Sequence, residues 1–155
     1  MDDDAGYPDA VLVDGAAGPD ARPDSVTSDA APPPDAAPCV GGTDPLVGPA
    51  GECYLFFTDG SNWTNAGASC AALVPPAHLV SIGSAAENTL LQAQLGSAEW
   101  WIGFSDGGSE GTFSWSSGEA TAFTNWRSGE PNNGNGDEDC AVIQGNQGGR
   151  WDDRL

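Results

Sequence analysis

All six tryptophans and all five phenylalanines of this 155-residue chain lie after residue 38. Residues 1–38 instead hold nine Asp, seven Pro and one Arg, and they carry a charge of −8. A segment with so few large apolar side chains cannot bury enough surface to offset the entropy lost on ordering. We therefore predict a disordered linker over residues 1–38 and one folded domain over residues 39–155, which is long enough for a single core.

The charge of the whole chain limits its partners. Twenty-three acidic residues face four arginines and no lysine, which gives a net charge of −19. Such a charge repels nucleic acid and anionic membrane surfaces. No apolar run reaches the roughly 18 to 20 residues that span a bilayer, so we expect no membrane insertion of this chain. Residues 1–10 lack the basic and apolar regions of a signal peptide, and we expect any export signal to lie outside this sequence.

Four cysteines lie in the predicted domain, at Cys39, Cys53, Cys70 and Cys140. Their number favours disulfides and therefore a secreted or extracellular protein, although four cysteines allow three pairings. Buried free thiols are the alternative. The spacing matches no Cys/His zinc motif.

Two short helices and one strand can be predicted between the second cysteine and residue 96. Trp63, Ala66 and Cys70 recur at helical spacing, with Asp59 or Ser61 as the expected N-cap. Residues 84–96 begin with a Ser-x-x-Glu capping box and end at a glycine that can adopt the left-handed conformation.

The segment HLVSI at residues 78–82 is predicted to be a strand. His78 is the only histidine of the chain, and it lies at the edge of this strand. There a packed or surface role is expected in place of a catalytic base.

Oxygen-bearing side chains are concentrated at residues 129–140, with the sequence GEPNNGNGDEDC. Calcium takes 6 to 8 such ligands and tolerates irregular geometry, so the segment predicts a calcium site. A solvated acidic loop is the alternative. The spacing does not fit an EF-hand, because the glycine and the glutamate that this motif requires are out of register.

Residues 39–155 resemble a C-type lectin domain that lacks its last part. The motifs that carry the resemblance are Cys53-Tyr54, Trp63, Cys70, HLVSI with the following capped helix, WIGF at residues 101–104, Trp115, Trp126, EPN at residues 130–132, Cys140 and WDD at residues 151–153. The resemblance implies an α+β fold of two helices and small antiparallel sheets, with a long calcium-binding loop region.

The resemblance also implies two calcium positions. The principal set would be Glu130, Asn132, Glu138, Asp152 and Asp153, and the second set would be Asp106, Glu110, Asn133, Glu138 and Asp139. Within the first set, Glu130, Asn132, Glu138 and Asp152 would also bind the sugar. The order Glu-Pro-Asn, with an expected cis proline, is similar to the mannose, fucose or N-acetylglucosamine type.

Two departures from the family pattern bear on activity. Asp152 stands where the family commonly has Asn, and a carboxylate cannot donate a hydrogen bond to a sugar hydroxyl. Family members also continue past residue 155 into a last strand with two cysteines, so we expect this sequence to be a fragment. The resemblance implies a Cys39–Cys53 disulfide and leaves Cys70 and Cys140 without their family partners, although a bridge between these two remains open.

The sequence therefore predicts calcium-dependent carbohydrate binding. A module that binds a protein or surface, with calcium ordering only the loops, is the alternative. An enzyme is not expected, because no nucleophile and base are paired, and Glu130 with Glu138 fits a metal better than a glycosidase pair. Trp101 and Trp115 are expected in the core and not on a sugar-stacking surface.

Overall fold

The structure is a computed structural model, and it describes residues 11–15, 42–48 and 51–155. The helices are α1 (Trp63–Ala71), α2 (Ala85–Gln92), η1 (Gly134–Gly136) and η2 (Gly145–Gln147). The strands are β1 (Val11–Gly15), β2 (Thr43–Val47), β3 (Cys53–Phe57), β4 (His78–Leu79), β5 (Glu99–Ser105), β6 (Ser114–Trp115), β7 (Cys140–Gln144) and β8 (Arg150–Arg154). Helices and antiparallel strands occur together, which confirms the predicted α+β class.

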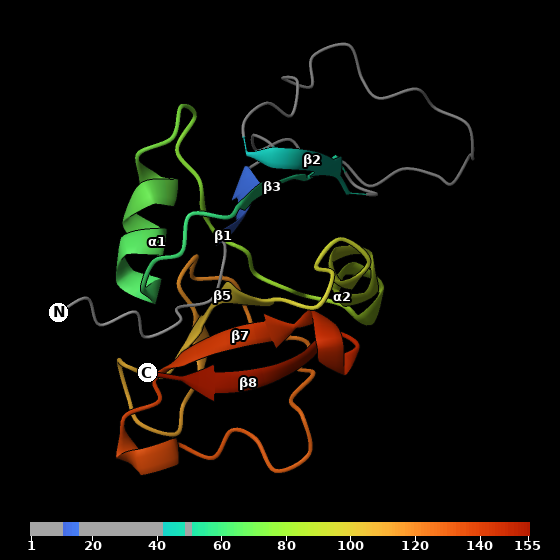
Figure 1. The fold of residues 1–155 in the computed structure, drawn as a ribbon. Coiled ribbons are helices and arrows are strands. Elements are labelled where there is room, and N and C mark those ends of the chain that lie inside the picture. Colours follow the sequence, from blue (N-terminus) through green and yellow to red (C-terminus); the bar gives the residue numbers. More distant parts are fainter. Residues whose placement is uncertain (1–10, 16–41, 49–50) are drawn as a thin grey trace, which may run out of the picture.

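The strands of the described residues form one sheet in the order β2-β3-β1-β5-β7-β8, and β4 and β6 pair with β1 and β5. Every pairing is antiparallel except that of β1 with β5, which are parallel where Val11 meets Trp101. Figure 1 shows α1 and α2 on opposite sides of β5, with β7 and β8 side by side at the far end of the sheet from β2.

Strand β1 corrects the prediction that all of residues 1–38 are disordered. Residues 11–15 pair with β3 from Val11–Phe57 to Gly15–Cys53 and extend the sheet between β3 and β5. The composition of the whole segment concealed the short run Val-Leu-Val, whose β-branched residues favour a strand. The other residues of the predicted linker lie outside the described residues.

Both predicted helices form, and their ends differ in part from the expectation. The N-cap of α1 is Asn62, whose side chain accepts the Asn65 N–H at 2.9 Å, so neither Asp59 nor Ser61 is the cap. Ser84 caps α2 as predicted, and its hydroxyl accepts the Glu87 N–H at 3.1 Å. Helix α2 ends at Gln92, and Gly96 takes up its positive φ of 59° in the turn that follows. The strand predicted at residues 78–82 is confined to β4.

The core is built around aromatic side chains that join the two halves of the folded chain. Phe104 on β5 packs against Trp115 at 4.4 Å between ring centroids and against Trp151 of β8 at 5.7 Å. Trp101 and Trp115 are buried, as predicted. Trp151 is fully buried, and its indole N–H donates to Asn88 Oδ1 at 2.8 Å. Strand β8 is therefore anchored from its second residue to both the aromatic core and α2.

The cysteines fall into two groups. Cys53 is disulfide-bonded, whereas Cys70 and Cys140 are free thiols, so the bridge left open between these two is absent. The predicted partner of Cys53, Cys39, lies outside the described residues, and that pairing stays a prediction. Burial raises the pKa of the Cys70 thiol to about 12, which keeps it protonated at neutral pH.

Candidate functional site

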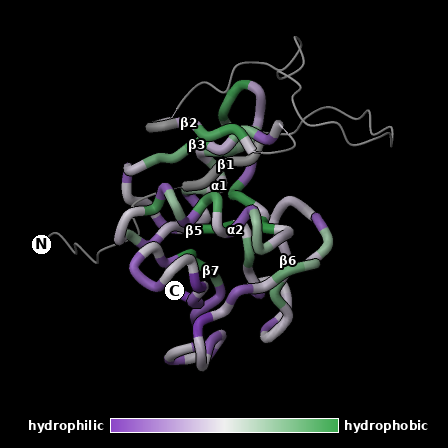
Figure 2. The backbone as a smooth tube through the Cα atoms, turned by 90° about the vertical axis from the view of Figure 1, so that its right-hand side faces the viewer, coloured by the Kyte–Doolittle hydropathy of each residue, from purple (hydrophilic) through white to green (hydrophobic). Residues whose placement is uncertain are grey.

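The site lies where the loop before η1 runs alongside β8, at the hydrophilic end of the molecule in Figure 2. The Arg127 N–H donates to the Trp151 carbonyl at 2.8 Å, and the Trp151 N–H donates to the Asn125 carbonyl at 2.9 Å. A turn follows, in which the Glu130 N–H donates to the Arg127 carbonyl at 3.0 Å. These bonds bring the Arg127 and Glu130 side chains beside the end of β8.

Asp153 holds the next part of the loop. Its carboxylate accepts the Asn132 N–H at 3.0 and 3.1 Å and the Asn133 N–H at 2.6 Å. The Glu130–Pro131 peptide is cis, as the resemblance implied. Asn133 has a φ of 47°, a left-handed conformation that asparagine tolerates better than most residues. The Glu-Pro-Asn segment is thus fixed to β8 through one fully buried carboxylate.

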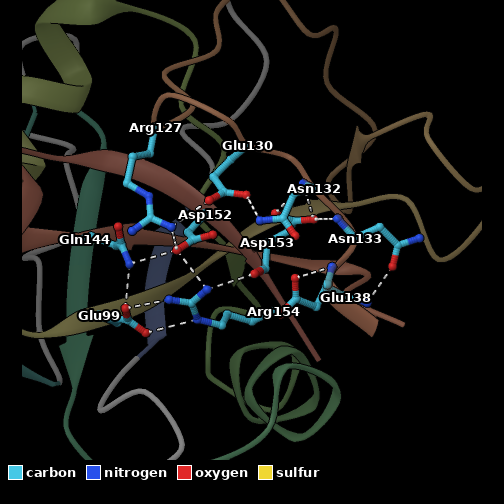
Figure 3. Close-up of polar contacts among 11 residues, drawn as sticks. Glu99, Arg127, Glu130, Asn132, Asn133, Glu138, Gln144, Asp152, Asp153 and Arg154 are labelled. Atoms are coloured by element: carbon cyan, nitrogen blue, oxygen red, sulfur yellow. Dashed lines mark hydrogen bonds and ion pairs between the residues drawn. The ribbon is translucent and has the colours of Figure 1, made fainter. Parts of the chain in front are cut away.

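Three carboxylates converge at this point. One oxygen each from Glu130, Asp152 and Asp153 lie within 4.8 Å of one another, and we call these residues the acidic cluster. The Asn132 side-chain amide donates to the Glu130 carboxylate, so the amide oxygen of this exposed residue lies at the edge of the same cluster (Figure 3). Four of the five residues predicted for the principal position are therefore neighbours.

The two oxygens of Asp152 have different surroundings. Oδ2 accepts three donors, from Arg154 at 2.8 Å, from Arg127 at 3.0 Å and from the Gln144 amide at 3.1 Å. Oδ1 is buried and has no hydrogen-bond partner. A buried carboxylate oxygen without a donor is costly unless a cation or water approaches it. The unpartnered oxygen of Asp152 is therefore a candidate ligand for a cation.

The charges of the cluster affect one another. Burial raises the pKa of the Asp152 carboxyl, the nearby Glu130 carboxylate raises it further, and the two arginines oppose this shift. The hydrogen bond to Glu130 and the charge of Asp152 together raise the pKa of the Arg127 guanidinium above its ordinary value. The cluster thus holds a partly compensated negative charge.

Sequence reasoning missed four residues of this network: Glu99, Arg127, Gln144 and Arg154. Arg154 is held from behind by Glu99, with its Nη2 at 2.9 Å from Glu99 Oε1 (Figure 3). Residues 39–155 contain only three arginines against 14 acids, so each arginine is a scarce positive charge in this domain. The small number of arginines could have indicated a role at the site, because two of the three, Arg127 and Arg154, contact the acidic cluster.

The residues predicted for the second position are linked in pairs, and we call them the loop group: Asp106, Glu110, Asn133, Glu138 and Asp139. Asn133 donates from its side chain to Glu110 and accepts the Glu138 N–H at 3.1 Å. Glu138 accepts the Gly134 N–H at 2.6 Å.

The remaining contacts of the loop group involve Asp106, which is buried. Its Oδ2 accepts the Gly111 N–H at 2.8 Å, and its Oδ1 has no partner. Its backbone N–H donates to the Asp139 carbonyl at 3.1 Å. Within the described residues, the loop group has no three carboxylates within ligand distance of one another. Glu138, which was predicted for both positions, is bonded to Asn133 and is not among the three converging carboxylates.

Comparison with known proteins agrees with this geometry. The sequence profile of the family described as "Lectin C-type domain" matches residues 59–155, which include both helices and the whole site. The chain belongs to the C-type lectin domain family. The fold class predicted from the resemblance is confirmed by the solved C-type lectin structures that the chain matches.

Three similar proteins illustrate the range of this family. The C-type lectin domain is 38% identical over 104 residues to the low affinity immunoglobulin epsilon Fc receptor of Mus musculus, covering 67% of this chain and 30% of that protein. It is 38% identical over 104 residues to lectin BRA-3 of Megabalanus rosa, and the match covers 66% of this chain and 64% of that protein. It also matches the crystal structure of the cow C-type carbohydrate-recognition domain of CD23 in the presence of GlcNAc2Man3 oligosaccharide. That match has 33% identity and a TM-score of 0.56, and it covers 61% of this chain and 70% of that chain.

The matched family is described as a lectin domain, and two of these relatives are named as a lectin and a carbohydrate-recognition domain, not as enzymes, which agrees with the prediction that the chain is not an enzyme. The match spans less than two thirds of the length of both curated relatives. In the part of the chain that the structure describes, no helix has the length and apolar character needed to cross a membrane.

Proposed function

We propose that this C-type lectin domain binds carbohydrate through a calcium ion held by Glu130, Asn132, Asp152 and Asp153. The observation that carries the proposal is the convergence of three carboxylates, one of which, Asp152, has a buried Oδ1 without a hydrogen-bond partner. All the side chains offered are oxygen donors, which suit calcium better than zinc or copper. The chemistry of the donor set therefore fits the ion that the family generally binds.

Calcium bound there would take two vicinal sugar hydroxyls into its own coordination shell. The protein's contribution is to orient those hydroxyls. Glu130 can only accept a hydrogen bond, whereas the Asn132 amide can also donate one, so the pair distinguishes the two hydroxyls by their direction. Asp153 fixes Asn132 relative to β8, because its carboxylate accepts the backbone N–H groups of Asn132 and Asn133.

The Glu-Pro-Asn order leads us to propose a mannose, fucose or N-acetylglucosamine ligand in place of galactose. The crystal structure of the related CD23 domain was obtained in the presence of GlcNAc2Man3, an oligosaccharide that contains two of these sugars. Asp152 weakens the contact with a sugar hydroxyl, because its Oδ2 is already bonded to two arginines and a carboxylate offers no donor. An unmatched polar contact costs roughly 1 to 3 kcal/mol, so we expect weak monovalent affinity.

The direct test is retention of the chain on immobilised mannose in calcium. Elution by a chelator is expected, and retention in excess chelator would contradict calcium dependence. The double variant Glu130→Gln with Asn132→Asp should shift preference toward galactose. Glu119→Gln, which changes an exposed acid near β6, is the matched control and should keep the original preference.

A second candidate is a protein- or surface-binding module in which calcium orders only the loops. The relative named as an immunoglobulin receptor favours it, as does the missing donor at Asp152. The loop segment at Asn132 and Asn133 is attached to β8 by Asp153, which such an ordering ion would reinforce. Calcium uptake in calorimetry combined with a blank glycan array would favour this candidate over the first.

We further propose a secreted or extracellular location for the protein. Extracellular calcium modules commonly have dissociation constants of about 0.1 to 1 mM, so occupancy would follow external calcium. Residues 1–38 would then connect the domain to a surface or a neighbouring domain, with residues 11–15 joined to the sheet. We propose that the loop group holds a second, weaker ion, because Asn133 carries no charge.

A further inference from the structure

The side chain of Arg127 bonds directly to two of the carboxylates that calcium would use. Nη2 of Arg127 is 2.6 Å from Glu130 Oε1 and 3.0 Å from Asp152 Oδ2, so a single nitrogen joins two of the three members of the acidic cluster (Figure 3). Charge-assisted bonds at these distances are among the stronger hydrogen bonds in proteins. The guanidinium therefore neutralises part of the cluster in the absence of a metal.

Arg127 differs from Arg154, the other arginine at Asp152. The Arg154 side chain is also bonded to Glu99 and to the Asp153 carbonyl, which hold it behind Asp152. The Arg127 side chain is 40% exposed, whereas those of its partners Glu130 and Asp152 are 5% and 1% exposed. The Arg154 side chain is nearly as exposed, at 32%, so the additional bonds of Arg154 are what distinguish the two arginines. The side-chain bonds of Arg127 go only to the acidic cluster, so its displacement would break fewer contacts.

We propose that Arg127 is an internal counter-ion that competes with calcium for Glu130 and Asp152. This inference rests on the proposed calcium site. A divalent cation at the acidic cluster would lie next to a guanidinium that is bonded to Glu130 and Asp152, and the two positive charges would repel each other at this short range. Arg127 must therefore move toward solvent before calcium binds, and its contact with the carboxylates raises the calcium concentration needed for occupancy.

The test compares Arg127→Gln with Arg150→Gln by calorimetric titration with calcium chloride alone. Arg150 is the matched control, because it is an exposed arginine of β8 that bonds the neutral Asn125 side chain at 3.2 Å. We expect Arg127→Gln to lower the calcium Kd about fivefold, the factor expected for the upper end of an exposed ion pair. Arg150→Gln should leave Kd within about twofold, because salt screens distant exposed charges.

Thermal unfolding gives a second readout that a merely structural role would not produce. In chelator, Arg127→Gln should unfold at a lower temperature than the Arg150→Gln control, because the cluster has lost its counter-ion. In saturating calcium the two variants should unfold at the same temperature, because Arg127 is then displaced in the parent chain. Arg127→Lys retains the charge without the planar fork and should give an intermediate Kd.

The outcomes separate this inference from the proposed function. If the parent chain binds calcium and Arg127→Gln binds it no more tightly than Arg150→Gln, the competition is overturned and the calcium site stands. If the Arg127→Gln chain binds calcium and the parent chain does not, the competition is supported in its strongest form. If no variant takes up calcium, the proposed function fails and the competition fails with it.

Discussion

The acidic cluster and the loop group contain similar residues, but they are organised differently. Two of the three carboxylates of the acidic cluster lie on β8 and are fully buried, and their positions follow from strand pairing and from Trp151. The loop group is spread over two loops and joined by pairwise hydrogen bonds. A preformed ligand set requires less ordering on binding than a dispersed one. The same ligand chemistry therefore gives a stronger candidate site when its residues lie on a strand.

The largest effect is expected from removing the anchor of the acidic cluster. Trp151→Ala deletes a fully buried side chain and its bond to Asn88, and we expect the free energy of unfolding to fall by about 3 to 5 kcal/mol. Urea denaturation measures this change. Trp151→Phe keeps an aromatic ring, so its free energy of unfolding should fall clearly less than that of Trp151→Ala. Equal losses from the two variants would mean that ring packing does not anchor β8.

The second effect concerns the carboxylate that holds the loop on β8. Asp153→Asn removes a charge and leaves one oxygen for the two backbone N–H groups of Asn132 and Asn133. We expect the affinity of the tighter calcium to fall roughly 100-fold. Calorimetry measures it, with the exposed Asp59→Asn as a charge-matched control. Similar affinities in the two variants would contradict the placement of the principal ion at the acidic cluster.

A smaller effect is expected at the loop group. Asp106→Asn replaces a buried carboxylate whose Oδ1 has no partner. If the loop group holds a second ion, the weaker step of the calcium titration should lose about tenfold in affinity while the tighter step is unchanged. A titration with one step in both chains would show that only the acidic cluster binds calcium.

The smallest effect is expected at the exposed edge of the loop group. Glu110→Gln keeps an oxygen that can accept from Asn133, so the weaker calcium step should change by about threefold or less. The free energy of unfolding should stay within about 0.5 kcal/mol of the parent value. A loss of calcium affinity as large as that of Asp153→Asn would contradict the distinction between the acidic cluster and the loop group.

The local elements of the fold were largely predictable from the sequence. The cap at Ser84 follows from a short-range pattern, and the burial of Trp101 and Trp115 follows from the general tendency of large aromatic side chains to fill the core. The cap of α1 was predicted one and three residues too early, since several polar residues there compete for the same role. Strand β1 was missed because its partners are distant in sequence.

The candidate site was predictable as a list of residues and not as an arrangement. Motif resemblance named Glu130, Asn132, Asp152 and Asp153, and the structure makes them neighbours. Glu138 was named with them, but its hydrogen bonds place it beside Asn133. Arg127 and Arg154 were not named, because no motif includes them and their role depends on contacts with Asp152.

Motifs and local patterns in the sequence were enough to predict the family, the α+β class, the helix near Ser84 and the oxygen-rich chemistry of residues 129–140. The tertiary structure alone decided which carboxylates converge, which oxygen of Asp152 stays without a partner and which arginines compensate the charge. The two kinds of feature depend on interactions over different separations in the sequence. Capping and periodicity act over three or four residues, whereas the bonds between Asp153 and the loop join residues 20 and 21 positions apart. Such separations are closed only when β7 and β8 pair and Trp151 packs into the core.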